Sequence, residues 1–358
     1  MKYLAYILIL GVLSCWIACG PVEKTSFSQD YVLIPWENQV EVHTIPFDSL
    51  QTSDPFIFAD RETQMYYLVC SGGTMWKSRN LSEWTGPYAF LEVDTLSWIG
   101  KNPWIWAPQL HQYKDKYYCF VTFTNPELIV DTVPDRYKVQ RRATKILVSE
   151  KVDGPYRPLT EQEYFPKKWS VNDGTLWVEN ETPYMVFGHG WMQTVDGQIN
   201  FVQLSSDLSQ TVGEFSRMFQ ASEASWSRDM QEIGELTFGM MLDGHAADGP
   251  FLFRTGTGKL GMLWSGWGEK RCAQGVAYSQ SGSLSGPWLQ VKEPLVADNS
   301  GHAMLFHTFD GKQLMLLHHQ SLDMRNPGPR RPLLLEVDTS GDELKILRRY
   351  EPSSNRVD

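Results

Sequence analysis

A short phrase of apolar and polar positions recurs five times between residues 54 and 316. Each copy begins with a short apolar strand, continues through a turn, and ends in a second strand that is usually rich in aromatic residues. Apolar runs of this length, bounded by turn residues, are typical of strands. The five copies occupy residues 54–69, 107–120, 173–187, 248–263 and 301–316.

A second phrase follows the first in most copies. It consists of a third strand, a turn, and a fourth strand that opens with glycine, proline and an aromatic residue. Three copies are complete, and a fourth, at 201–205, keeps the strand but lacks the Gly-Pro pair. The complete copies place the third strand at 75–78, 146–149 and 275–279, and the Gly-Pro-aromatic triplet at 86–88, 154–156 and 286–288.

Units of four strands that follow one another without helical periodicity predict an all-β fold, a five-bladed β-propeller with four-stranded antiparallel blades. A blade is too small to bury its own faces, so neighbouring blades must supply the core. A β-sandwich is the alternative, but it does not explain why one phrase recurs. We expect a signal peptide over 1–19, a tether over 20–45 and the propeller over 46–352. The stretch 223–247 predicts a long loop or a short helix over one face.

The first residues carry the features of a secretory signal. Lys2 precedes the apolar run 4–13, which is shorter than the roughly 20 residues of a membrane-spanning helix. The residues around Cys19 resemble a bacterial lipoprotein cleavage box, so Cys19 is the expected lipidated residue and Cys15 the alternative. A plain cleaved signal peptide is a third interpretation. We expect an exported protein, either a lipoprotein of the cell envelope or a periplasmic or secreted one.

The charge balance argues against nucleic-acid binding, because 42 acidic residues face 32 basic ones and the net charge is −10. The one dense basic run, 138–142 with Lys145, is interpreted as a solvated loop. The 14 tryptophans indicate packed β-structure together with surfaces that stack on flat ligands such as sugars. The cysteines beyond the leader lack metal-ligand spacing and are expected to be buried thiols, with one disulfide compatible but not placeable: Cys70, Cys119 and Cys272.

Three acidic residues lie at the starts of predicted blades. Because the first strand of every blade lines the central channel, Asp54, Asp173 and Asp248 are expected to converge on the axis. A glycosidase needs two carboxyl groups beside the scissile bond, one ionised and one protonated, and a third acid can hold the pair in opposite states. Acids at strand starts also serve as turn caps, which is the alternative for each residue alone.

The blade-start motifs, taken in order, resemble those of glycoside hydrolase family 43. The resemblance covers nearly the whole chain after the leader and implies an inverting hydrolase of arabinose- or xylose-containing plant polysaccharides, of the α-L-arabinofuranosidase or β-xylosidase type. We expect exo action, although the sequence itself does not distinguish exo from endo cleavage. A five-bladed glycosidase for galactose-type linkages and a catalytically weak carbohydrate-binding propeller are the alternatives. The motifs are Asp54-Pro55-Phe56, Trp106-Ala107-Pro108, Asn172-Asp173-Gly174-Thr175, Asp248-Gly249-Pro250-Phe251 and Gly301-His302-Ala303-Met304.

The resemblance also implies a role for each acid. Asp54 corresponds to the general base, Asp173 to the residue that tunes the pKa of the proton donor, and Asp248 to the general acid. The family has glutamate at the last position, and aspartate is shorter by one methylene. Nearby glutamates are therefore alternative donors: Glu223, Glu232 and Glu235. His302 corresponds to an axial histidine near a bound calcium or water cluster, although no cofactor is required.

Several other side chains are candidate substrate contacts. Gln109 stands where the family more often has an acidic residue that contacts substrate. His189 follows a strand and is expected to face the channel, and Arg331 is expected to bind a sugar hydroxyl or to form an ion pair. We expect a monomer that binds oligosaccharide or polysaccharide and meets a membrane only through its lipid anchor. Rings that could stack on sugar or pack between blades are Trp76, Trp106, Trp191 and Trp264.

Overall fold

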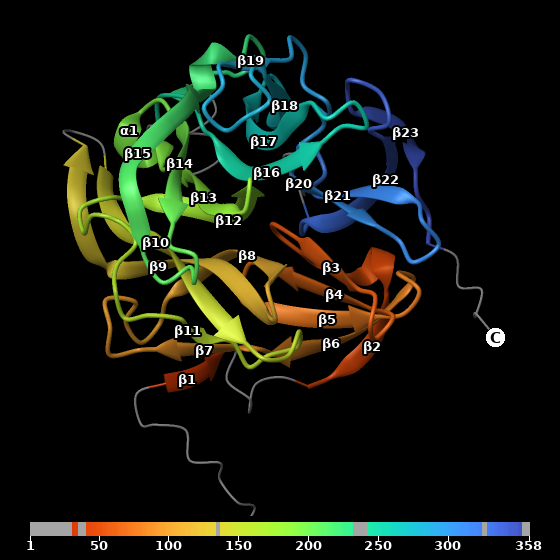
Figure 1. Cartoon of the computed structure of the whole chain (residues 1–358), viewed down its shortest axis with the longest axis horizontal. Coiled ribbons are helices and arrows are strands. Elements are labelled where there is room, and N and C mark those ends of the chain that lie inside the picture. Colours follow the sequence, from red (N-terminus) through yellow and green to blue (C-terminus); the bar gives the residue numbers. More distant parts are fainter. Residues whose placement is uncertain (1–30, 35–40, 134–136, 232–241, 324–327, 353–358) are drawn as a thin grey trace, which may run out of the picture.

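The described residues fold into five antiparallel β-sheets arranged around a central axis, as Figure 1 shows, and a sixth, two-stranded sheet outside them. The structure, a computed structural model, describes residues 31–34, 41–133, 137–231, 242–323 and 328–352. The one α-helix that lies entirely within these ranges is the short α1 (Trp191–Thr194). The predicted all-β, five-bladed propeller is therefore confirmed, whereas Cys15 and Cys19 lie outside the described residues.

The strands of each blade pair in chain order, from the axis outward. The first two strands correspond to the first recurring phrase of the sequence, and the third and fourth strands to the second phrase. Two 3₁₀ turns accompany them, η2 (Phe47–Ser49) and η3 (Ala221–Glu223). Blade 1 contains β3 (Phe56–Asp60), β4 (Met65–Cys70), β5 (Thr74–Ser78) and β6 (Glu83–Ala89), with β2 (His43–Pro46) outside β6. Blade 2 contains β8 (Trp104–Tyr113), β9 (Lys116–Val133), β10 (Tyr137–Ser149) and β11 (Arg157–Pro158).

The remaining blades repeat this order. Blade 3 contains β12 (Val171–Glu179), β13 (Thr182–His189), β14 (Gln198–Leu204) and β15 (Thr211–Gln220). Blade 4 contains β16 (Asp248–Arg254), β17 (Leu260–Gly268), β18 (Arg271–Ser279) and β19 (Trp288–Gln290). Blade 5 contains β20 (Ser300–His307), β21 (Gln313–His319), β22 (Arg331–Asp338) and β23 (Lys345–Arg349).

The hydrophobic core lies between the blades. Ile199 and Phe219 of blade 3, for example, are buried against Met262 and Trp264 of blade 4. Burying a side chain of this size contributes about 1.5–3 kcal/mol, so each interface is a substantial part of the stability of both blades. The three described cysteines are free thiols; Cys70 and Cys119 are buried as predicted, whereas Cys272 is only partly buried.

Part of the predicted tether is strand, which corrects the expectation for residues 20–45. β1 (Tyr31–Ile34) pairs with β7 (Leu91–Asp94), and β2 pairs with β6. The apolar, β-branched run of β1 suits an edge strand, and this preference outweighs the polar composition around it. No helix in the described ranges is long and apolar enough to cross a membrane.

The basic run 138–142 is not a solvated loop, because it lies in β10, which pairs with β9 as one long hairpin. Arg141 is buried and forms an ion pair with Glu163 at 2.8 Å. Lys145 is also buried, and its ammonium donates to the carbonyls of Thr160 and Gln162. The hairpin extends well beyond the strands that the apolar pattern predicts at 116–120 and 146–149.

A residue with positive φ lies just before the inner strand of blade 1 and in a bulge of the inner strand of blades 2 to 5. The ladder between the first and second strands skips two residues in blades 2 to 5. Asp248 therefore lies one position before Asp54 and Asp173 in the repeat, which corrects the predicted alignment. The equivalent residues are Asp54 (φ 54°), Ala107 (φ 43°), Asp173 (φ 54°), Gly249 (φ 57°) and His302 (φ 56°).

Candidate functional site

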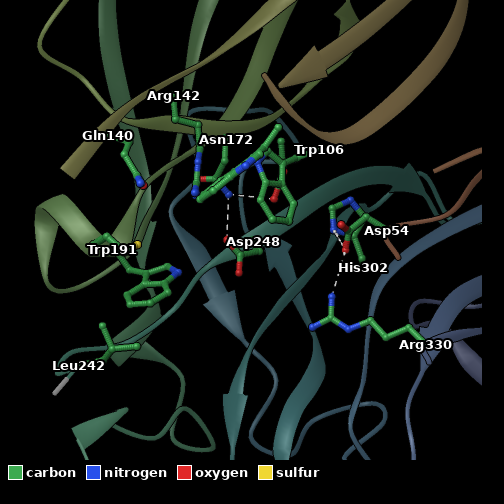
Figure 2. A pocket seen from close by; sticks show the side chains of 13 residues that line it. Asp54, Trp106, Gln140, Arg142, Asn172, Trp191, Leu242, Asp248, His302 and Arg330 are labelled. Atoms are coloured by element: carbon green, nitrogen blue, oxygen red, sulfur yellow. Dashed lines mark hydrogen bonds and ion pairs between the residues drawn. The ribbon is translucent and has the colours of Figure 1, made fainter. Parts of the chain in front are cut away.

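A cavity of about 470 Å³ opens where the inner strands begin, and Figure 2 shows the side chains that line it. All three predicted acids, Asp54, Asp173 and Asp248, line this cavity. The convergence expected from ring closure therefore occurs. The other lining residues are Trp104, Trp106, Gln140, Arg142, Asn172, Trp191, Met192, Leu242, His302 and Arg330.

Asp54 lies beside His302 and Arg330 on one side of the pocket (Figure 2). Ser71 donates to its Oδ2 at 2.5 Å. Its Oδ1 lies 3.5 Å from His302 Nδ1, 3.4 Å from His318 Nδ1 and 3.9 Å from a nitrogen of Arg330. Burial alone would raise the pKa of Asp54, but the charges of His302 and Arg330 outweigh burial and hold that pKa well below its usual range. Asp54 is thus kept ionised.

Asp248 is buried in surroundings of the opposite kind. Burial raises its pKa to about 7, and the negative charge of Asp173 adds to this rise. His302, Arg142 and a hydrogen bond from Asn172 oppose the rise without cancelling it. Asp248 therefore carries a proton in mildly acidic solution, where Asp54 does not.

Asn172 joins the other two acids. Its Nδ2 donates to Asp173 Oδ2 and to Asp248 Oδ1, both at 2.8 Å. The same Asp173 oxygen accepts the backbone N–H of Gly249 at 3.0 Å. One buried amide thus bridges two carboxyl groups from neighbouring blades.

His302 lies beside Asp54, and Gly249 leaves the space that the His302 imidazole occupies. A Cβ on Gly249 would lie 2.8 Å from Nδ1 of His302, so only glycine lets the imidazole approach the backbone of blade 4. The Nε2 of His302 is buried and has no protein partner in the described ranges.

The described residues around His302 include no cluster of metal-binding side chains. Calcium takes roughly six to eight oxygen ligands. No group of three or more His, Cys, Asp or Glu side chains within the described part of the chain could hold a metal ion.

Aromatic side chains form one wall of the pocket. Trp104 is 45% exposed and meets Trp106 edge to face, with ring centroids 6.2 Å apart. Arg142 lies over Trp106 at 5.6 Å, and its Nε donates to the hydroxyl of Thr124. Trp191, on α1, lines the pocket farther along (Figure 2). Flat rings beside carboxyl groups suit a sugar, whose C–H faces stack on aromatic surfaces.

Several predicted contacts lie outside this pocket. Trp76 and Trp264 are buried between blades, which is the alternative that the sequence left open. Gln109 is buried on β8 and does not line the pocket. His189 stacks on Trp169 with centroids 4.5 Å apart instead of facing the cavity.

Arg331 and Glu223 also lie elsewhere. Arg331 donates to the backbone carbonyl of Asp48 at 2.6 Å, and the preceding Arg330 takes the place beside Asp54. Glu223 accepts the N–H of Gln220 at 2.9 Å in a capping box, which explains its position away from the pocket. The other two alternative donors lie outside the described residues: Glu232 and Glu235.

The sequence reasoning missed some pocket residues. Asn172 is the first residue of the Asn-Asp-Gly-Thr motif, and its position directly before Asp173 could have identified it as a pocket residue. Trp104 precedes the Trp-Ala-Pro motif by two residues, so it shares the face of Trp106 on an extended strand. No sequence signal marked the others, which the fold brings from distant segments: Gln140, Arg142, Met192, Leu242 and Arg330.

The chain is similar to a family of known proteins and to several solved structures. The family model described as glycosyl hydrolases family 43 matches residues 43–344. The crystal structure of an endo-arabinase from Bacteroides thetaiotaomicron VPI-5482 is 33% identical, with a TM-score of 0.69 over 82% of this chain and 96% of that chain.

Two other solved structures are more distant and support the fold alone. A thermostable family-43 glycoside hydrolase is 20% identical, with a TM-score of 0.67 over 87% of this chain and all of that chain (100%). A xylan β-1,4-xylosidase from Bacillus halodurans C-125 is 17% identical, with a TM-score of 0.59 over 88% of this chain and 56% of that chain. A comparison with curated protein sequences gave no match.

Proposed function

The chain belongs to glycoside hydrolase family 43 and is a glycosyl hydrolase, and from this premise we propose that it cleaves arabinofuranosyl linkages of plant polysaccharides with inversion. One observation carries the proposal. A single pocket contains a carboxylate held ionised, Asp54, and a carboxyl group held protonated, Asp248. Opposite protonation states on two acids are what single-displacement hydrolysis requires.

The proposed step uses three acids. Asp54 accepts a proton from water as the water oxygen attacks the anomeric carbon. The bond from that carbon to the leaving oxygen breaks, and this oxygen takes the proton of Asp248. Asp173 stays beside Asp248 and, through its negative charge, keeps the proton on Asp248 until the leaving oxygen needs it. Attack from the face opposite the leaving group inverts the anomeric centre.

Arabinose is proposed as the first sugar to test, because the similar Bacteroides structure, at 33% identity, is named an endo-arabinase. Xylose is the second, supported by the fold shared with the more distant xylosidase. For this chain we propose exo action. The β9–β10 hairpin, α1 and Leu242 pack together and raise one side of the pocket, which favours binding of a chain end.

Product analysis tests the reaction and its mode. The chain is incubated with linear arabinan, arabinoxylan and xylo-oligosaccharides, and early products are separated and their anomeric configuration is read by NMR. We expect single sugars from arabinan from the first minutes, with inverted configuration. A mixture of long fragments would overturn exo action, and retained configuration would overturn the single displacement. Aryl glycosides of arabinofuranose, xylopyranose and galactopyranose then rank the sugars.

Substitution tests the roles of the acids. Asp54→Asn and Asp248→Asn keep the shape of each side chain, and we expect each to lower kcat by about 10²–10⁴-fold while the protein stays folded. Kinetics and thermal unfolding are measured on the same preparations. Near-normal turnover in Asp54→Asn would remove the proposed base. Oligosaccharide binding without any product in the unmodified chain would favour a binding propeller.

Export and lipidation at Cys19 are proposed on the leader sequence alone. Mass spectrometry of the mature amino terminus tests them. We expect a diacylglyceryl group on Cys19, whereas a lipid on Cys15 or an unmodified terminus would contradict this assignment.

A further inference from the structure

A ring of side-chain acceptors connects each blade to the next. In four of five junctions, the backbone N–H of the positive-φ residue donates to a side chain that lies in, or directly after, the second strand of the preceding blade. These pairs are Ala107 to Ser71 (2.9 Å), Asp173 to Thr122 (2.9 Å), His302 to Ser265 (2.6 Å) and Asp54 to His318 (3.2 Å).

The junction from blade 3 to blade 4 breaks this rule. The register pairs Thr122 with Trp106, Ser265 with Asp248 and Gly188 with Asn172. At this position blade 3 therefore has a glycine and no side chain to accept the N–H. The carboxylate of Asp173 accepts the N–H of Gly249 in its place, at 3.0 Å.

The missing side chain leaves the space that Asn172 occupies. A Cβ on Gly188 would lie 3.1 Å from Asn172 Oδ1 and 3.2 Å from its Nδ2, which is tighter than ordinary van der Waals contact. A serine there, as in blade 4, would add an oxygen beyond that Cβ. Gly188 has no positive φ, so the residue is small for reasons of space and not of backbone geometry.

We propose that Asn172 is a positioning residue that directs the proton of Asp248 to Oδ2, and that Gly188 is glycine in order to admit it. This inference rests on the proposed function. Asn172 Nδ2 donates to Asp248 Oδ1, which makes Oδ1 an acceptor and leaves Oδ2 to carry the proton. Figure 2 shows the second oxygen of Asp248 pointing away from Asn172.

The orientation of the amide follows from its neighbours. Both hydrogen-bond partners of Nδ2 are carboxyl oxygens. An ionised carboxylate only accepts hydrogen bonds, and of these two acids only Asp248 carries a proton that it could donate to an amide oxygen. The amide must therefore turn its NH₂ group toward Asp173. The Oδ1 of Asn172 is buried without a protein partner in the described ranges. The charged and titratable groups around Asp248 are Asp173 from β12, Arg142 from β10, Cys272 from β18 and His302 from β20.

The test compares natural and activated substrates in the full chain. An oligosaccharide leaving group needs the proton of Asp248, whereas dinitrophenolate leaves without one. We expect Asn172→Ala to slow oligosaccharide hydrolysis by about 10²-fold, as small misplacements of reacting groups do, and dinitrophenyl glycoside hydrolysis much less. Its alkaline pH limb should move to higher pH, because the lost hydrogen bond favours ionised Asp248.

Gly188→Ser is a second variant that tests the same inference, because it keeps Asn172 but fills the space that the Asn172 side chain occupies. We expect the same selective loss on oligosaccharide and the same direction of pH shift. Asn200→Ala is the matched control, since Asn200 is a buried asparagine on β14 of the same blade that does not line the pocket. It should leave both the pH profile and the ratio of the two substrates unchanged.

The outcomes separate this inference from the proposed function. Loss on both substrates alike, with no pH shift, would mean a purely structural role and overturn the inference. Normal activity in Asn172→Ala together with the expected loss in Asp248→Asn would overturn the inference and leave the proposed function. Normal oligosaccharide hydrolysis in Asp248→Asn would overturn both.

Discussion

At the scale of single residues, two aspartates of the same pocket differ because of their neighbours. Asp54 has Ser71, His302, His318 and Arg330 around its carboxylate. Asp248 is buried near Asp173, another acid. Identical side chains thus acquire opposite tendencies to hold a proton, and the difference comes from strands that ring closure brings together.

The pH dependence of the rate should follow this difference. Activity requires ionised Asp54, whose pKa lies well below its usual range, and protonated Asp248, whose pKa is about 7. We therefore expect kcat/KM to be level in mildly acidic solution and to fall tenfold per pH unit as pH rises well past about 7. The profile is measured with a substrate whose leaving group needs protonation. A rate that keeps rising to pH 9 would contradict the assignment of Asp248 as the acid.

At the scale of elements, the β9–β10 hairpin and α1 shape the pocket wall, and Gln193 of α1 joins them. Its Nε2 donates to Asp131 of β9 at 3.0 Å and to the carbonyl of Lys168 at 2.8 Å. Its Oε1 accepts the N–H of Ser170 at 2.9 Å and lies 3.1 Å from His189 Nε2. Through its contact with Gln193, His189 helps to hold α1 and the pocket wall in place.

Removing this junction should weaken substrate binding more than catalysis. Gln193→Ala loses several hydrogen bonds that hold α1, so Trp191 should become less well placed against the sugar. We expect KM for oligosaccharide to rise about 3- to 10-fold with little change in kcat, since a hydrogen bond is worth about 1 kcal/mol. Gln64→Ala, in an exposed turn of blade 1, is the control. An unchanged KM would mean that the wall stands without Gln193.

The elements also separate what sequence could predict from what it could not. The blade count and most strands followed from the recurring phrases, because the strand period and turn residues are local properties. The one-residue offset of Asp248 did not, because it depends on which residue takes the positive φ at the bulge, and in blade 4 that residue is Gly249. Arg142 was misread because tertiary pairing extends β10 past its apolar pattern.

At the scale of the whole molecule, ring closure depends on contacts between separate blades and not on a shared strand in the described ranges. In the described ranges, blade 1 contains strands from the amino-terminal part only and blade 5 strands from the carboxyl-terminal part only. The two blades meet through a common cluster that includes Leu68 and Met75 of blade 1 and Met304 and Leu316 of blade 5. Asp54 lies at this junction, since its N–H donates to His318 of blade 5.

Tyr66 should be a main support of that junction. It is 3% exposed, its ring stacks on Phe309 at 4.2 Å, and its hydroxyl accepts the N–H of Phe309 at 2.9 Å. We expect Tyr66→Phe to lower the free energy of unfolding by about 1 kcal/mol, because a partly buried N–H loses its acceptor. Tyr66→Ala should lower it by about 3–5 kcal/mol, because a cavity also forms.

Chemical unfolding and residual activity, measured on the same samples, test this closure. Because Asp54 depends on contact with blade 5, activity in Tyr66→Ala should be lost at the same denaturant concentration as the fold, or below it. Tyr113→Phe is the control, since its hydroxyl makes a 3.3 Å contact in exposed surroundings and its loss should change stability by less than about 0.5 kcal/mol. Equal stability of Tyr66→Ala and Tyr113→Phe would show that the ring is held together elsewhere, and activity that outlasts the fold of blade 5 would separate Asp54 from this junction.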